Sequence, residues 1–124
     1  MRLTSVSVGT ERPRELAEFY ARLLGTTVAL AEDDWALVRA PGGLSVGFER
    51  ERHFRRPVWP SVAGEQTASQ HLDIEVDDGD LDAAVAHAVA CGAVLANEQP
   101  QAHVRVLFDP HGHPFCLWLD PERE

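Results

Sequence analysis

Apolar and polar positions along the first half of the chain predict one strand, one helix and three further strands. Residues 3–8 alternate in polarity, which is typical of a strand with one buried face. Pro13 suits the first turn of a helix, and Gly25 suits its C-terminal cap. The apolar residues at helical spacing between them are Leu16, Phe19, Leu23 and Leu24. Short strands are then expected near residues 27–30, 35–39 and 44–49.

The second half of the chain repeats this order. Residues 71–76 alternate strictly and predict a strand, Asp80 can cap the helix that follows, and Gly92 can end it. The apolar face expected for this helix comprises Leu81, Ala84, Val85 and Ala88. Short strands are expected near residues 93–96, 104–109 and 114–119. The repeated order predicts an α+β fold in which two βαβββ modules form a curved mixed sheet around a cleft.

The length of 124 residues favours a single domain with a core large enough to fold without disulfides. Module one is expected over about residues 1–50 and module two over about residues 69–124. Residues 51–68 are charged at first and then rich in proline, which indicates a linker.

Alternation along each strand predicts which side chains share the face away from the helices. Leu72, Ile74 and Val76 should pack under a helix, so His71, Asp73 and Glu75 should face the other way. By the same rule Leu44, Val46 and Phe48 face a helix, as do Phe115, Leu117 and Leu119. The remaining candidates for the polar face are Ser5, Ser7, Gly47, Glu49, Cys116 and Trp118. Such a face, curled around a cleft, is typical of a small-molecule site, and the alternative is a solvated sheet face.

Charge and composition narrow the function further. The net charge of -9 argues against a nucleic-acid or anionic-membrane surface. The chain contains no lysine, which excludes a Schiff-base lysine and a phosphate-loop lysine. The first residues lack the apolar run of a secretory signal, so a cytoplasmic protein is expected.

Three stretches resemble the vicinal oxygen chelate superfamily, which includes glyoxalase I, bleomycin-resistance proteins and extradiol dioxygenases. Residues 18–25 (EFYARLLG) are similar to its first helix end, residues 71–76 (HLDIEV) to the first strand of its second module, and residues 109–117 (DPHGHPFCL) to its closing hairpin. The resemblance is nearest to the glyoxalase-like subgroup of unassigned activity. It implies the glyoxalase/bleomycin-resistance fold and a homodimer.

Metalloenzymes of the superfamily hold a divalent ion with one ligand from each of four strands. The resemblance places these ligands at Ser5, Gly47, His71 and Cys116, and only His71 keeps the usual residue. Glu49 lies two residues from Gly47 on the same face. Any metal would therefore be held by His71 and Glu49, less readily with Cys116. Without a carboxylate at position 116, glyoxalase I activity is not expected.

Other aromatic, basic and sulfur-containing residues could contact a ligand, but each also has a purely structural interpretation. Trp35, Trp59 and Trp118 are candidates for stacking on a flat ligand, with Trp59 alternatively joining the two modules. The basic residues in and just before the linker form a cluster that comprises Arg50, Arg52, Arg55 and Arg56, with His53. This cluster could bind an anion, but a solvated linker is the simpler interpretation. His111 and His113 are expected on the surface of the closing turn, and Cys91 in the core.

Two classes of function follow. The first is binding of a small molecule in the cleft, with aromatic molecules among the candidates, without the usual four-ligand metal site. The second is a metal-dependent lyase, isomerase or dioxygenase acting on vicinal oxygens, with His71 and Glu49 as ligands and Asp73 nearby. A degenerate module that serves only as an interaction domain is a third, weaker reading.

Overall fold

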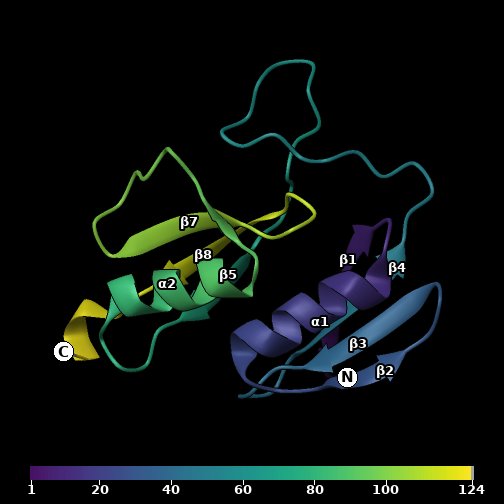
Figure 1. Ribbon diagram of the computed structural model, residues 1–124, viewed down its shortest axis with the longest axis horizontal. Helices are drawn as coiled ribbons and strands as arrows, with labels where there is room; N and C mark the ends of the chain where they lie inside the picture. Colours follow the sequence, from purple (N-terminus) through teal and green to yellow (C-terminus); the bar gives the residue numbers. More distant parts are fainter. Residues whose placement is uncertain (124) are drawn as a thin grey trace. The chain divides into compact units, whose positions relative to one another are not determined.

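Each half of the chain folds as a strand, a helix and three further strands, as the sequence predicts (Figure 1). The computed structural model describes residues 1–123. It divides into two compact units, Met1–Phe54 and Arg55–Glu124, and each is described here by itself. The strands form two four-stranded mixed sheets, one in each unit, where the sequence predicted one curved sheet. Within residues 1–123, no helix is long and apolar enough to cross a membrane.

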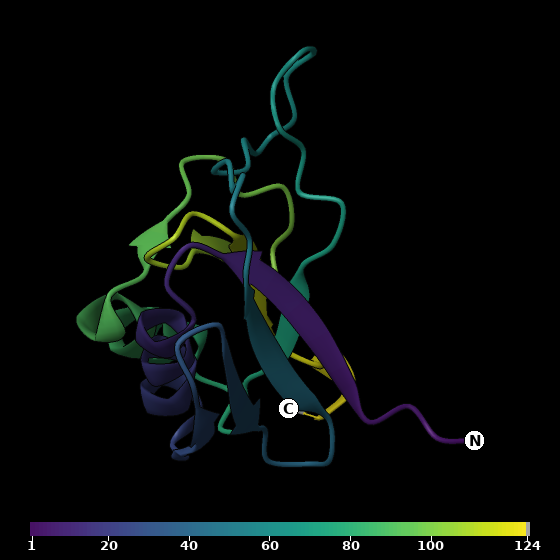
Figure 2. The ribbon, with the colours of Figure 1, turned by 90° about the vertical axis from the view of Figure 1, so that its right-hand side faces the viewer.

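The first unit contains one helix and one sheet with strand order β1-β4-β3-β2. Its elements are β1 (Ser5–Thr10), α1 (Pro13–Leu24), β2 (Val28–Ala31), β3 (Trp35–Arg39) and β4 (Ser45–Arg50). The strand β1 runs parallel to β4 and beside it, and the other pairs are antiparallel (Figure 2). The helix α1 packs against all four strands.

Apolar residues at helical spacing form the core between α1 and the first sheet. Leu16 and Phe19 are fully buried, and the ring of Tyr20 stacks on Phe48 of β4 with the centroids 5.5 Å apart. The helix ends at Gly25, whose φ of 69° is left-handed and whose N–H reaches back to the last turn. The predicted helix and its cap are confirmed.

The second unit contains a sheet with strand order β5-β8-β7-β6 and one helix. Its elements are β5 (Leu72–Glu75), α2 (Leu81–Cys91), β6 (Val94–Leu95), β7 (Val104–Phe108), β8 (Pro114–Trp118) and the short 3-10 helix η1 (Pro121–Arg123). The side chain of Asp80 accepts a hydrogen bond from the backbone N–H of Ala83 at 3.0 Å, which confirms the predicted cap. Residues 51–71, between the two sheets, contain neither helix nor strand.

The alternation rule gave the buried faces of β4 and β8 correctly, whereas Leu72, Ile74 and Val76 at β5 are only half-buried and Gly47, expected on the polar face, is buried. Val46 and Phe48 are buried under α1, and Phe115 and Leu117 are buried in the second unit. Leu44, predicted to face the helix, is 46% exposed. It lies one residue before β4, where the backbone still belongs to the turn after β3, so strand alternation does not yet apply to it.

Candidate functional site

The polar face of the second sheet brings together three chemistry-bearing side chains. Asp73 of β5 is paired in register with Cys116 of the parallel strand β8. Residues paired in this way point to the same face of a sheet. His71 lies two positions before Asp73, and therefore on the same face, immediately before β5 begins.

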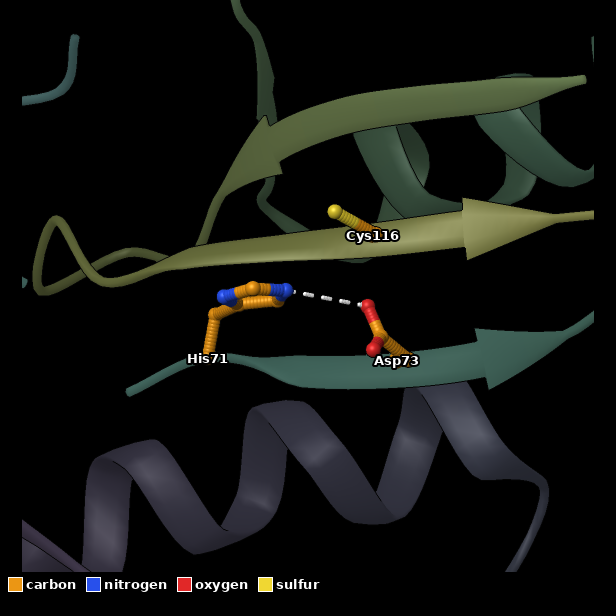
Figure 3. A group of neighbouring side chains, drawn as sticks. All are labelled: His71, Asp73 and Cys116. Atoms are coloured by element: carbon orange, nitrogen blue, oxygen red, sulfur yellow. Dashed lines mark ion pairs between the residues drawn. The ribbon is translucent and has the colours of Figure 1, made fainter. Parts of the chain in front are cut away.

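These three residues form a tight group, which we call the His71 cluster (Figure 3). The Nε2 atom of His71 lies 3.2 Å from Oδ1 of Asp73, and the side chains are 50% and 60% exposed. One ligand atom each from His71, Asp73 and Cys116 lie within 4.8 Å of one another. The cluster therefore offers one nitrogen, one oxygen and one sulfur to a shared partner at the surface of the sheet.

The Cys116 thiol is held in its protonated form. Partial burial raises its pKa from an ordinary 9.0 to about 11, and the negative charge and hydrogen bond of Asp73 add to this effect. A thiol of this kind donates a hydrogen bond at neutral pH and is a poor nucleophile. Cys116 is half-buried on the polar face, beside the carboxylate of Asp73.

Aromatic side chains lie on the same face as the His71 cluster. Trp118 is two residues beyond Cys116 on β8 and is half-buried, as predicted for an aromatic wall. Phe108 of β7 pairs with Pro114 at the other end of β8. The ring of Trp59 packs edge-on against Phe108 with the centroids 6.4 Å apart. Sequence reasoning missed Phe108, although its position at an even spacing from Val104 and Val106 would have placed it on this face.

The remaining predicted site residues lie on the polar face of the first sheet. Ser5 and Glu49 are exposed, and Gly47 is buried. A Cβ atom added at Gly47 would lie 3.2 Å from Oγ of Ser7 and 3.5 Å from Nε1 of Trp35. The position where the family resemblance implies a metal ligand is thus covered by an indole and a hydroxyl.

The donor set of the His71 cluster fits a metal site with three protein ligands. Zinc accepts imidazole nitrogen, thiolate sulfur and carboxylate oxygen together, and catalytic zinc sites keep a fourth position open. The four-ligand site implied by the resemblance does not fit, because Gly47 has no side-chain donor. Asp73, which the resemblance does not mark as a ligand, is the carboxylate of the set.

The closing hairpin is built around a buried carboxylate, and the expectation that His111 and His113 lie on the turn surface is wrong. Asp109 is fully buried and lies 2.9 Å from Nδ1 of His113, whose side chain is 16% exposed. The same carboxylate accepts the backbone N–H groups of His111 and His113. His111 is itself buried. These histidines hold the turn together, which removes them from the ligand candidates.

Two arginines of the linker cluster, Arg50 and Arg56, make contacts within the fold. Arg50 pairs with Asp34 at 3.4 Å. Arg56 donates to the carbonyl of Pro110, and its side chain lies over Gly112. A depression of about 810 Å³ in the first unit is lined by three arginines and three carboxylates: Glu11, Arg12, Asp34, Arg50, Glu51 and Arg52. Its mixed charge does not favour an anion clamp.

Cys91 is also placed differently from its prediction. It is half-buried on α2, with its sulfur 3.8 Å from Nε2 of His87, instead of lying in the core. The cause is the weak amphipathicity of α2, in which alanines occupy both faces and only Leu81 and Ala88 are buried.

The two βαβββ modules, each with a helix on one face of a mixed sheet, define the glyoxalase/bleomycin-resistance class of fold. Residues 5–118 match the family model of the glyoxalase-like domain. The chain belongs to this family, within the vicinal oxygen chelate superfamily.

Solved structures of the same fold cover nearly all of the chain at low identity. A glyoxalase/bleomycin resistance protein/dioxygenase family enzyme from Burkholderia phytofirmans is 18% identical, with a TM-score of 0.73 over 96% of this chain and 98% of that chain. The fosfomycin resistance protein FosX from Listeria monocytogenes is 12% identical, with a TM-score of 0.72 over 100% of this chain and 98% of that chain. No curated protein matches the sequence. At these identities the likeness shows the fold alone.

Proposed function

We propose that the chain binds a small aromatic molecule on the polar face of the second sheet, without a four-ligand metal site. The observation that carries the proposal is the His71 cluster, flanked on the same face by Trp118 and Phe108. Small-molecule sites combine apolar and aromatic walls with a few convergent polar groups, and this face has both.

The three polar groups offer complementary hydrogen bonds to a bound molecule. Asp73 accepts, the Cys116 sulfur accepts weakly because its proton bonds to Asp73, and the His71 imidazole donates or accepts according to its tautomer. A ligand with adjacent hydroxyl or carbonyl oxygens would satisfy all three at once. Its flat body would lie against the aromatic side chains, where stacking adds to the burial of apolar surface.

A metal-dependent enzyme is the second candidate, and the same three donor atoms favour it. His71, Asp73 and Cys116 would hold a divalent ion such as zinc, which polarises substrate oxygens when bound. Binding would require loss of the Cys116 proton, since thiolate is the ligand form. Glu49, the ligand expected beside His71, belongs to the first unit and is not part of the group.

We also propose a homodimer, on the family resemblance, and a cytoplasmic location. Sedimentation of the purified chain tests the dimer: a single species of about twice 13.7 kDa is expected, and a monomer at micromolar concentration would refute it.

The test combines metal analysis with ligand binding. The chain is purified without an affinity tag or chelator, and its metal content is measured alongside the variants His71→Ala and Cys116→Ser. Stoichiometric zinc, nickel, manganese or iron that is lost in both variants would establish the metalloenzyme. Absence of metal, with none taken up on titration, would exclude it.

Ligand binding is then followed by tryptophan fluorescence with catechol and 1-naphthol as probes. The proposal predicts saturable binding that His71→Ala and Asp73→Ala weaken at least about tenfold, since each removes a side chain that hydrogen-bonds to the ligand. His53→Ala is the matched control, because His53 is an exposed histidine of the linker region. If neither probe binds, or if the His71 variant binds as tightly as the control, the proposal is wrong.

A further inference from the structure

A second depression lies entirely within the first unit, on the polar face of its sheet. It has a volume of about 700 Å³ and is formed by the residues before β1, the end of β3 and the turn that leads to β4. Its apolar lining residues are Trp35 and Leu37, which are half-buried, and Leu3 and Leu44, which are 78% and 46% exposed. Its lining therefore combines polar groups with apolar side chains, among them one half-buried indole.

The charge of this depression is opposite to that of the protein. Arg2 and Arg39 line it, and no aspartate or glutamate does, although the chain carries a net charge of -9. In the part of the chain that the structure describes, neither guanidinium forms an ion pair. The other depression of the first unit, lined by Arg12 and Arg50 among others, differs because its arginines are matched by an equal number of carboxylates.

The backbone on either side fixes these groups to the sheet. The N–H of Ser45 donates to the carbonyl of Thr4 at 3.1 Å, which anchors the segment that carries Arg2 beside the start of β4. Arg39 is paired in register with Ser45, so its side chain points to the same face as the hydroxyl of Ser45. The indole of Trp35 reaches over Gly47, where the missing side chain leaves room for it.

We infer that this depression binds a planar aromatic anion, with a carboxylate as the charged group. Arginine presents paired N–H donors that match a carboxylate, and charge-assisted hydrogen bonds of this kind are the strong ones. The indole of Trp35 offers a flat apolar surface for the aromatic body. The inference concerns residues 2–45 of the first unit and does not rest on the function proposed for the His71 cluster.

Calorimetric titration of the full chain with 1-naphthoate tests the inference, with 1-naphthamide as the uncharged analogue and decanoate as the aliphatic anion. Naphthoate is expected to bind about tenfold to a hundredfold more tightly than naphthamide, because the amide loses the charge-assisted bonds. Arg39→Gln and Arg2→Gln should each weaken naphthoate binding at least about fivefold, whereas Arg39→Lys retains part of it. Binding should also weaken with added salt.

The control variant is Arg55→Gln, which removes an exposed arginine outside the depression. Equal affinities of the Arg39→Gln and Arg55→Gln variants would overturn the inference, as would equal binding of naphthamide or the absence of naphthoate binding. Equal binding of decanoate would overturn the aromatic class. His71→Ala separates the two proposals: naphthoate binding should survive it, and its loss would place the anion on the second unit.

Discussion

The reactivity of Cys116 can be predicted from its surroundings. In the folded chain its pKa is raised to about 11, first by desolvation and then by the charge and hydrogen bond of Asp73. Only the thiolate reacts with alkylating reagents. Cys116 should therefore react with iodoacetamide much more slowly in the folded chain than in the unfolded one, where its pKa returns to the ordinary 9.0.

The size of the effect follows from the two ionisation constants. At pH 8, a thiol of pKa 9 is roughly 10% ionised and a thiol of pKa 11 roughly 0.1%, a hundredfold difference in thiolate. The more basic thiolate is intrinsically more nucleophilic, which recovers a factor of roughly ten. Folded Cys116 should thus react about ten times more slowly at pH 8 than in the unfolded chain.

The assay is alkylation over a range of pH, with Cys116 and Cys91 resolved in separate peptides by mass spectrometry. The rate at Cys116 should still rise with pH above 10, where an ordinary thiol has levelled off. Asp73→Asn should lower the midpoint partway, because desolvation remains; Asp77→Asn, an exposed carboxylate just after β5, is the control. A midpoint near 9 in the folded chain, or no response to Asp73→Asn, would refute the reasoning.

Three predictions concern stability, each checked by urea unfolding. Gly112→Ala should lower the free energy of unfolding by roughly 2–3 kcal/mol, because the φ of Gly112 is +92° and an added Cβ would clash with the side chain of Arg56. An unchanged unfolding midpoint would contradict this. Asp109→Ala should lower the free energy of unfolding by about 3 kcal/mol, because the N–H of His113 and the other donors to the carboxylate lose their acceptor. Asp109→Asn should lower it less, and equal losses in the two variants would argue against the hydrogen bonds. Asp80→Ala should cost about 1 kcal/mol through loss of the helix cap, whereas a neutral result would mean that water replaces it.

The raised pKa of Cys116 also gives a pH dependence of stability. Ionisation of this thiol favours the unfolded chain, where the proton leaves at lower pH. The contribution is fully present below pH 9 and is lost as the pH rises toward 11. Cys116→Ser should flatten the pH dependence of the unfolding midpoint in that range, and an unchanged profile would argue against the raised pKa.

The fold was accessible from the sequence because its signals are local. Gly25 and Gly92 each follow the last apolar residue of a helix, and the cap at Asp80 is a side-chain contact across three residues. The bounds of the strand at residues 35–39 were predicted without error for the same reason. Strand alternation also predicts His71, Asp73 and Cys116 on the sheet face away from the helices, and the register of β5 and β8 places Asp73 opposite Cys116.

What the sequence could not supply depends on contacts between distant residues. The closing hairpin has a polar, histidine-containing sequence that is typical of an exposed turn. Asp109 is nevertheless buried, because three hydrogen-bond donors converge on its carboxylate. Likewise, nothing local in the sequence says that Trp35 covers Gly47, since the two residues belong to different strands. The proximity of Asp73 to Cys116 needed the register of two strands separated by more than one element.

The contact between Trp35 and Gly47 bears on how this protein could change in evolution. A glutamate or histidine introduced at position 47 would meet the Trp35 indole and the Ser7 hydroxyl before it reached any ligand. Its effect would therefore depend on which residue stands at position 35, so the two sites are epistatic. A smaller residue at position 35 would give a side chain at position 47 more room, but the tightest contact of the added Cβ, 3.2 Å from the Ser7 Oγ, would still require that hydroxyl to move.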